Sequence, residues 1–458
     1  MREILVEAEE FKDSPVGKIP KDWEVKTVAS VAHLVTKGTT PTSYGFDYKD
    51  EGILFLRVEN ITEDGKIGSG KPIFIDNETH RFLYRSQLEL GDILISIAGT
   101  IGRIAVVDSS ILPANSNQAI ALVRVERTQI EPSFLRWFLI SEVGQQSLLS
   151  QSVQLAQANL SLGQIATTFI PVPPLCEQQG IGEILDTIDS TIAHTSSLIA
   201  KLKQMKAGLL HDLLTRGLDE NGELRDAIAH PEQFKDSPLG QIPKDWLVVS
   251  VGECLARIEQ GWSPDCESNN TPLGEWGVLK TTAVVWEGYQ DFENKQLPSH
   301  LQPDPNYEVK RGDVLMTRAG PNSRVGVVAL VRQTQGKLML SDKLYRLIPR
   351  DYVKPDFLAY TLSGNRTQRH LSTLKTGLAE SQTNISQEIV RTLLIALPKI
   401  QEQERIINIL DTHDTRIRTE EAYRDKLKLQ KKGLMHDLLT GKVRIKDADK
   451  FTPASDTV

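Results

Sequence analysis

The chain has 458 residues, of which 40% are hydrophobic and 25% charged, and its formal net charge is −7. This length exceeds what one hydrophobic core organises, so we expect two or more domains. The acidic balance excludes a protein that coats nucleic acid without selection, but it allows a local basic groove that binds one duplex. The sequence has no run of roughly 18 to 20 apolar residues and no secretion signal, so neither a membrane protein nor a secreted one is expected.

No motif of an enzyme stands out. Cys176, Cys254 and Cys266 have no CxxC spacing and no nearby pair of histidines, so we expect no disulfide framework and no zinc site, and a reducing cytoplasm fits. Phosphate-binding GxxxxGK[ST] loops, GxGxxG, HExxH and GxSxG are all missing from the sequence. The dipeptide His-Asp occurs twice, at residues 211–212 and 436–437, inside apolar helical segments, where a helix-surface or partner contact is favoured over a metal ligand. We expect no catalytic residue and no metal in this chain.

The sequence repeats itself along its whole length. KDSPVGKIPKDWEV at residues 12–25 returns as KDSPLGQIPKDWLV at residues 235–248. GDILIS at residues 91–96 returns as GDVLMT at 312–317, and GLLHDLLT at 208–215 returns as GLMHDLLT at 433–440. Such a repeat decides the architecture, which is a tandem duplication with about 220 residues in each copy. The copies are nearly identical at their ends and diverge between them, as expected for one fold that faces two different targets.

The interior of each copy is predicted to be a mixed α/β globule. In the first copy, short β-branched runs bounded by Gly, Asp and Asn predict strands at residues 53–58, 92–96, 103–107 and 119–125. Pro132 in a first turn predicts a helix over residues 132–149.

Each copy ends in a long heptad pattern. After Pro173 and Pro174, apolar residues recur in steps of four and three to about Thr215, and Gly217 follows as a helix cap. Pro398 and Gly441 bracket the same pattern in the second copy. The apolar seam residues are Ile181, Leu185, Ile192, Ile199, Leu202, Leu209 and Leu213 in the first copy, and Ile406, Leu410, Ile417, Leu427, Leu434 and Leu438 in the second. Each helix should be about 60 Å long.

Neither seam is apolar enough to stand alone in water, so we expect the two helices to pair. A two-fold-like arrangement makes them antiparallel, with Ile181 opposite Leu438. Ile188 then faces Lys431, which is a poor match unless the lysine reaches out of the seam with its ammonium group. Such a coil places one globule at each end.

The order of these motifs, present twice, resembles the specificity subunit of type I restriction-modification enzymes over nearly the whole chain. The residues that carry the resemblance are IPxDW at the head of each copy, KGTTP at 37–41 against QGWSP at 260–264, and the GDILIS and GLLHDLLT repeats. The resemblance implies an α+β fold in which two α/β target-recognition domains are separated by two long helices that form an antiparallel coiled coil with pseudo-two-fold symmetry. The expected segments are domain 1 at 1–172, helix 1 at 173–217, domain 2 at 218–397, helix 2 at 398–444 and a tail at 445–458.

The resemblance also implies a function. Each domain reads one half of a bipartite asymmetric site in double-stranded DNA, and the coil acts as a ruler for the gap. Two methyltransferase subunits methylate N6 of one adenine in each half, and restriction subunits add an ATP-dependent nuclease. The subunit itself catalyses nothing, and S-adenosylmethionine, ATP and Mg²⁺ are expected on the partner subunits. Two alternatives stay open, namely a stand-alone methyltransferase or nuclease and a two-headed protein-binding scaffold.

DNA sequence is read at base edges, whereas contacts to phosphates fix position. The hydroxyl-rich loop 36–44 and its counterpart 259–268 are the first candidates for groove contact, with an ordinary solvent turn as the alternative. Asn117 and Gln118 stand where the other copy has Ser341, Asp342 and Lys343, so the copies differ here, as residues that read different bases should. Capping of a strand edge is the alternative for these positions, and a surface ion pair is the alternative for Arg57 and Lys280. The candidate contacts are Lys37, Thr39, Thr40, Arg57, Asn60, Arg103, Asn117 and Gln118 in the first copy, and Gln260, Trp262, Ser263, Lys280, Arg318, Asn322, Arg324 and Lys343 in the second.

Other repeated residues are assigned shared tasks. Arg103 and Arg324 both follow the loop after the GD strand, so phosphate anchoring suits them better than discrimination. Trp23 and Trp246 lie in the nearly identical segments and are assigned to packing. We expect these segments to seat each globule on the distal end of the other copy's helix.

Overall fold

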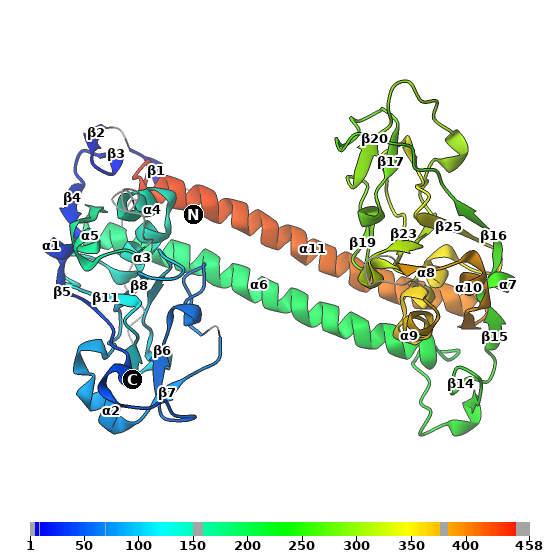
Figure 1. Ribbon diagram of the computed structural model, residues 1–458, viewed down its shortest axis with the longest axis horizontal. Coiled ribbons are helices and arrows are strands. Elements are labelled where there is room, and N and C mark those ends of the chain that lie inside the picture. Colours follow the sequence, from blue (N-terminus) through cyan, green and yellow to red (C-terminus); the bar gives the residue numbers. More distant parts are fainter. Residues whose placement is uncertain (1–4, 9, 69, 150–158, 376–382, 446–458) are drawn as a thin grey trace. The chain divides into compact units, whose positions relative to one another are not determined.

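The computed structural model describes residues 5–8, 10–68, 70–149, 159–375 and 383–445. The chain divides into two compact units, one made of Met1–Ser196 with Glu421–Val458 and the other of Ser197–Glu420 (Figure 1). Each unit combines one copy's globule with part of both long helices. Among the described residues, no helix has the length and apolar character that crossing a membrane requires.

Unit 1 is built on a four-stranded antiparallel sheet in the order β5-β11-β8-β9 and a three-stranded mixed sheet in the order β10-β6-β7. The strands are β5 (Ala32–Lys37), β6 (Ile53–Leu56), β7 (Phe74–Ile75), β8 (Ile93–Ser96), β9 (Ile104–Val106), β10 (Ala114–Ser116) and β11 (Ile120–Val125). A further pair joins β4 (Glu24–Thr27) to β12 (Phe169–Val172), and β2 (Phe11–Ser14) pairs with β3 (Gly17–Pro20). The short helices are α1 (Val28–Val31), α2 (Asn77–Phe82), α3 (Pro132–Ile140), α4 (Glu142–Leu149) and α5 (Leu162–Thr167).

Unit 2 repeats both sheets, in the orders β16-β25-β21-β23 and β20-β17-β24. The strands are β16 (Leu255–Gln260), β17 (Gly277–Leu279), β20 (Asn294–Gln296), β21 (Val314–Thr317), β23 (Val328–Leu330), β24 (Leu338–Met339) and β25 (Leu344–Pro349). Strand pairs outside these sheets are β13 (Phe234–Lys235) with β14 (Ile242–Pro243), β15 (Leu247–Ser250) with β27 (Leu394–Leu397), β18 (Val284–Val285) with β19 (Gly288–Tyr289), and β22 (Ala319–Gly320) with β26 (Thr383–Asn384). The helices are α7 (Val251–Cys254), α8 (Pro355–Ser363), α9 (Asn365–Leu374) and α10 (Gln387–Thr392). The shared strand order confirms that one fold has been duplicated.

The four predicted strands of the first copy are confirmed as β6, β8, β9 and β11. The predicted helix over residues 132–149 is wrong in one respect, because it is two helices, α3 and α4, that break at Ser141. Ser141 is extended, with ψ at 159°, and its hydroxyl oxygen accepts a hydrogen bond from Gly144 N at 3.1 Å. A serine whose side chain accepts a bond from the backbone N–H three residues later is a common start of a helix. The continuous apolar pattern predicts a single helix through this position.

The two long helices are confirmed as α6 (Leu175–Thr215) and α11 (Ile400–Leu439). Gly217 and Gly441 follow their ends with φ of +63° and +69°, the left-handed backbone that glycine adopts at helix caps. Of the predicted tail at 445–458, only Ile445 is among the described residues. It ends β28 (Val443–Ile445), which pairs with β1 (Leu5–Glu7), a pairing of the two chain ends that the sequence did not indicate.

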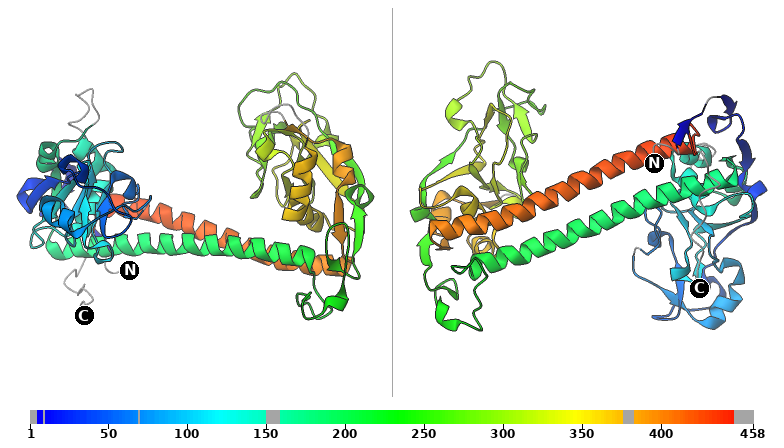
Figure 2. Two further views of the ribbon diagram at one scale, coloured as in Figure 1. Left: turned by 60° about the horizontal axis from the view of Figure 1, so that its bottom comes forward. Right: turned by 180° about the vertical axis from the view of Figure 1, so that it is seen from behind.

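Within each unit the two long helices lie side by side and run antiparallel (Figure 1 and Figure 2). In unit 1, Lys431 of α11 bonds to Asp189 of α6 at 2.5 Å, and in unit 2 Lys206 of α6 bonds to Asp414 of α11 at 2.5 Å. All thirteen predicted seam residues are buried or half-buried. The expectation that Lys431 reaches out of the seam is wrong, because its ammonium group stays largely buried. It pairs with the buried Asp189, the neighbour of Ile188, and lies 4.5 Å from the Trp137 ring.

The repeated IPKDW segment forms the same clamp in both units. In unit 1 the Glu177 carboxylate, at the start of α6, accepts bonds from Trp23 Nε1 at 3.2 Å and from Arg444 Nε at 2.7 Å. Arg444 belongs to β28, just past the end of α11, and its hydrogen bonds to Glu177 raise its pKa. A Cβ on Gly441 would lie 2.4 Å from Pro20 Cδ and 3.0 Å from Trp23, so the segment rests directly on the cap of α11.

In unit 2 Glu402 takes the place of Glu177. It accepts bonds from Trp246 Nε1 at 3.0 Å, Arg225 Nη1 at 2.8 Å and Leu218 N at 2.8 Å, while Trp246 rests on Gly217. Both tryptophans are fully buried, so their assignment to packing is confirmed. The predicted job of the repeated segment is confirmed too, since each copy's segment sits on the helix end of the other copy.

Candidate nucleic-acid interface

Three segments that the sequence singled out meet at one edge of unit 1. Thr39 N of the loop after β5 donates to Ser116 O at 3.0 Å, and Asn117 N donates to Leu56 O at 2.9 Å, which places the turn after β10 beside Arg57. Lys37 and Gln118 are exposed, while Thr39, Thr40, Arg57 and Asn117 are half-exposed. We call this set of residues, namely Lys37, Thr39, Thr40, Arg57, Asn117 and Gln118, the unit 1 edge.

The loop can lie this close because residue 38 is glycine. A Cβ at Gly38 would meet Ser116 O at 2.1 Å and Asn117 O at 2.2 Å. Such distances would force the loop away from the turn, because both neighbours are backbone atoms.

We expect Gly38→Ala to weaken binding of this unit to its preferred DNA by about 5- to 150-fold, the cost of removing one good interaction with a base. Competition binding with duplex libraries measures it. Gly208→Ala is the matched control, because a Cβ at this position of α6 meets nothing within 4 Å, and that variant should keep DNA binding. Equal weakening in both variants would contradict the assignment.

Unit 2 builds the equivalent edge from different side chains. Trp262 N donates to Leu340 O at 3.0 Å, and Ser263 Oγ accepts from Asp342 N at 3.1 Å. Arg318 N donates to Lys343 O at 2.9 Å, so Arg318 joins the same turn. The residues of this unit 2 edge are Gln260, Trp262, Ser263, Lys280, Arg318, Ser341, Asp342 and Lys343. The structure thus brings the loop and the turn together in both copies, although whether they touch DNA stays a prediction.

Unpaired polar atoms gather at these two edges. Ten buried side-chain nitrogen or oxygen atoms lack a hydrogen-bond partner in the described part of the chain. Four of them belong to edge residues, and a fifth belongs to Ser116, the neighbour of Asn117. They are Arg57 Nε and Ser116 Oγ in unit 1, and Arg318 Nε, Ser341 Oγ and Asp342 Oδ1 in unit 2. Buried polar groups are normally paired with protein or water, so these atoms have hydrogen-bonding capacity left for water or for a ligand.

Some predicted contacts, including Trp262 and Lys280 of the unit 2 edge, are placed less favourably. Asn60 is only 4% exposed and its Oδ1 accepts a bond from Arg57 N at 2.8 Å, so it caps a turn instead of facing a groove. Trp262 is half-buried against a small cluster that includes Met339. Lys280 Nζ donates to Asn270 Oδ1 at 3.2 Å, whereas Asn322 lies exposed in a short 3-10 turn, Asn322–Arg324.

The predicted equivalence of Arg103 and Arg324 is wrong. Ser96 Oγ accepts from Arg103 N seven residues later, and its counterpart Thr317 Oγ1 accepts from Val327 N ten residues later. The loop is three residues longer in the second copy, so Val327 takes the place of Arg103. Arg103 Nη1 donates to Ile61 O at 2.7 Å within the fold, while Arg324 is exposed, so the two arginines do not share a task.

The sequence analysis missed an aromatic cluster next to the unit 1 edge. Tyr44, Phe82 and Tyr84 are 57%, 51% and 71% exposed, and the Phe82 ring lies 5.3 Å from Tyr44 and 5.0 Å from Phe46. Arg85 Nη2 donates to Thr36 Oγ1 at 3.5 Å, which ties this segment to the loop. The signal was the mixed basic and aromatic run HRFLYR at residues 80–85. Exposed apolar rings can contact thymine methyl groups in the major groove of duplex DNA.

No group of three or more His, Cys, Asp or Glu side chains that could hold a metal ion occurs among the residues described. His211 and His436 lie exposed on the surfaces of α6 and α11, as expected for the repeated His-Asp pair.

Comparison with known proteins gives a consistent result. The family model of the type I restriction modification DNA specificity domain matches residues 20–204 and 243–429, one match in each copy. The EcoEI type I specificity subunit of Escherichia coli is 38% identical over 218 residues, which are 47% of this chain and 35% of that protein, so the match spans about a third of that relative's length. The putative MjaX type I specificity subunit of Methanocaldococcus jannaschii is 27% identical over 96% of this chain and 97% of its own.

Two solved structures share the fold. The type I restriction-modification S subunit from M. genitalium has a TM-score of 0.56 at 14% identity, covering 93% of this chain and 98% of that one. A chain from a study of the assembly and conformational transition of the type I R-M system has a TM-score of 0.50 at 19% identity, covering 93% and 99%.

Proposed function

The chain belongs to the family of type I restriction modification DNA specificity domains, and we propose that it is the subunit that selects the DNA sequence for a type I restriction-modification complex. Each unit would read one half of a bipartite asymmetric site, and the paired helices would set the length of the gap. The observation that carries this proposal is the contrast between the two edges. The same loop and turn meet in both units, but the side chains they present are different.

The edges suit direct readout of bases. The exposed Gln118 can bond to adenine through two hydrogen bonds, and Lys343 can donate to guanine. Asn117 Oδ1 accepts a bond from Ala119 N at 3.2 Å, so Asn117 also caps the turn. Exposed lysines and arginines nearby would hold the phosphates and fix position. The exposed rings of Tyr44, Phe82 and Tyr84 would add apolar contacts, such as those to thymine methyl groups, on one side of the unit 1 edge.

The chemistry would come from partner subunits. We propose that methyltransferase subunits modify N6 of one adenine in each half-site, with S-adenosylmethionine bound to them, and that restriction subunits supply ATP- and Mg²⁺-dependent cleavage. In this assignment the present chain contributes binding and orientation and no catalytic group.

Methylation-aware sequencing of genomic DNA, from the host with and without this gene, tests the proposal. We expect a two-part motif with methylated adenines to be present in the host, to vanish on deletion, and to return when the gene is supplied again. An unchanged methylation pattern would contradict the proposal. DNA methylation or cleavage by the purified chain alone would favour a stand-alone enzyme, and failure to select a split motif from random duplexes would favour a protein-binding scaffold.

A further inference from the structure

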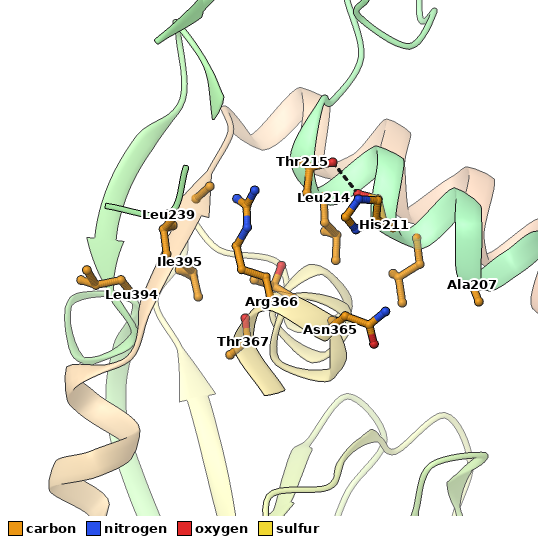
Figure 3. Close-up of a pocket in the computed structure, with 14 residues that line it drawn as sticks. Ala207, His211, Leu214, Thr215, Leu239, Asn365, Arg366, Thr367, Leu394 and Ile395 are labelled. Atoms are coloured by element: carbon orange, nitrogen blue, oxygen red, sulfur yellow. Dashed lines mark hydrogen bonds between the residues drawn. The ribbon is translucent and has the colours of Figure 1, made fainter. Parts of the chain in front are cut away.

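Unit 2 contains a pocket that plays no part in the candidate DNA edge. It lies between the end of α6, the start of α9 and strand β27, and its cavity volume is about 90 Å³ (Figure 3). Seven of its fourteen lining residues are aliphatic, and none is Asp or Glu. Arg366 reaches from α9 into the space between Ile395 and Leu214.

Arg366 is unusual because it is half-buried and, among the described residues, makes neither an ion pair nor a hydrogen bond. Within the described residues it has no carboxylate partner, and burial lowers the pKa of its guanidinium. Other half-buried arginines of this unit bond to a carboxylate, as Arg332 does to Asp411, or to a backbone carbonyl, as Arg405 does to Asp219 O. A desolvated cation without a partner is costly, so its retention calls for an explanation outside the fold.

A second polar group in the pocket is also unpaired. Thr361 lines the cavity, is 7% exposed, and its buried Oγ1 has no hydrogen-bond partner within the described part of the chain. Two lining residues, Arg366 and Thr361, therefore carry unused hydrogen-bonding capacity.

The first copy shows that the fold does not need these groups. Gln145 Nε2 donates to Gly102 O at 2.9 Å and Leu139 O at 2.7 Å, and Gln368 Nε2 makes the same two bonds in unit 2, to Gly326 O and Leu362 O. This match fixes the alignment of α4 with α9.

By that alignment Val143 takes the place of Arg366, and Phe138 takes the place of Thr361. Val143 and Phe138 are apolar and pack in the unit 1 core. Leu439 is buried in the same core, whereas Leu214, its counterpart in the first copy's helix, is half-buried at the unit 2 pocket. In unit 1 apolar side chains fill the space that corresponds to the pocket, whereas in unit 2 this space is a cavity that contains the Arg366 guanidinium.

We propose that this pocket of unit 2 binds an acidic side chain flanked by aliphatic residues, presented by a partner polypeptide. The carboxylate bonds to Arg366, and an aliphatic neighbour packs among the leucines of α6. A protein segment fits better than DNA, because the anion of DNA is a phosphodiester between sugars and offers nothing to an aliphatic lining. Since unit 1 lacks the charge, two copies of one partner would dock unequally on the two units.

The identity of the partner rests on the proposed function, whereas the chemistry of the pocket does not. A direct test therefore uses the full chain with acetyl-Leu-Glu-Leu-amide, following the arginine Nε–Hε signals by NMR and assigning Arg366 with Arg366→Lys. We expect the peptide, at up to about 10 mM, to shift the Arg366 signal and to leave that of Arg369, an exposed arginine on the same helix, unchanged. The glutamine peptide and inorganic phosphate should have no effect. No shift with the glutamate peptide would overturn the proposal, and an equal shift with phosphate or a DNA duplex would assign the pocket to DNA instead.

A second measurement titrates the chain with the methyltransferase subunit proposed above. Arg366→Val introduces the residue that the first copy has at this position. It should weaken the binding of one of the two methyltransferase subunits by about 30-fold or more and leave the binding of the other unchanged. Arg369→Ala should change neither step. Arg366→Val should also raise Tm, because it removes an unpaired cation, and this checks that the variant folds. Unchanged binding steps would overturn the proposal, while a wild-type chain that binds no methyltransferase subunit would contradict the proposed function and leave the peptide result to decide the pocket.

Discussion

Replacing Glu402 with alanine is expected to lower the free energy of unfolding of unit 2 by about 3 to 5 kcal/mol, the usual cost of removing one partner of a buried ion pair. Glu402 is 4% exposed, and its removal leaves Arg225 with only the partly exposed Asp245 as a carboxylate partner and Trp246 Nε1 and Leu218 N without this acceptor. The two units need not unfold together, so amide hydrogen exchange within unit 2 is the suitable measurement.

Glu404→Ala is the matched control for this experiment. Glu404 lies two residues further along α11 and pairs with Lys354, but both side chains are partly exposed, at 51% and 37%. Such pairs contribute about 0 to 1 kcal/mol, so the control should be destabilised only slightly. Equal destabilisation by Glu402→Ala and Glu404→Ala would contradict the clamp.

Changing the turn of the unit 1 edge is expected to alter one half of the recognised DNA site and not the other. In the double variant Asn117→Ala, Gln118→Ala, discrimination at that half should fall by about 5- to 150-fold for each pair of hydrogen bonds to a base that the variant removes, equivalent to about 1 to 3 kcal/mol. Methylation-aware sequencing of DNA modified by the assembled complex measures both halves at once.

The reciprocal variant supplies the control for this second experiment. Lys343→Ala, on the unit 2 edge, should change only the half that the first variant leaves intact. If either variant relaxed both halves, the two units would not read independently, and if neither changed a base preference, the edges would not be the reading surfaces.

The candidate edges were predictable in part because their segments repeat. Loop 36–44 and the turn at Asn117 stood out by comparison of the two copies, and the structure places them in hydrogen-bond contact through Thr39 and Ser116. The comparison of the two copies did not show whether the Asn60 side chain faces solvent or the backbone. Only folding decided that its side chain turns inward onto Arg57 N, since a polar residue in a loop can cap the backbone as readily as face solvent.

Equivalence between the copies could also mislead. Arg103 and Arg324 follow similar letters, but the hydrogen bonds of Ser96 and Thr317 show that the loops differ by three residues. Sequence spacing cannot say where a loop takes up an insertion, whereas strand register does, because a strand that slips by one residue turns its buried face outward.

By itself, the sequence determined the duplication, the long helices with their capping glycines and apolar seams, and four strands of the first globule. These features are predicted by periodic patterns of nearby residues. Such patterns depend only on backbone geometry and on which side chains avoid water. It also indicated the job of the IPKDW segment, because nearly identical ends imply a shared contact.

Only the tertiary structure decided which charges meet. The clamp joins Trp23, Glu177 and Arg444 from three distant parts of the chain. The Arg366 guanidinium is isolated because none of the residues that line its pocket is Asp or Glu. No periodic pattern in the sequence predicts either feature. Whether a buried charge is paired or isolated depends on which groups the fold brings within a few ångströms, and spacing along the chain does not encode that distance.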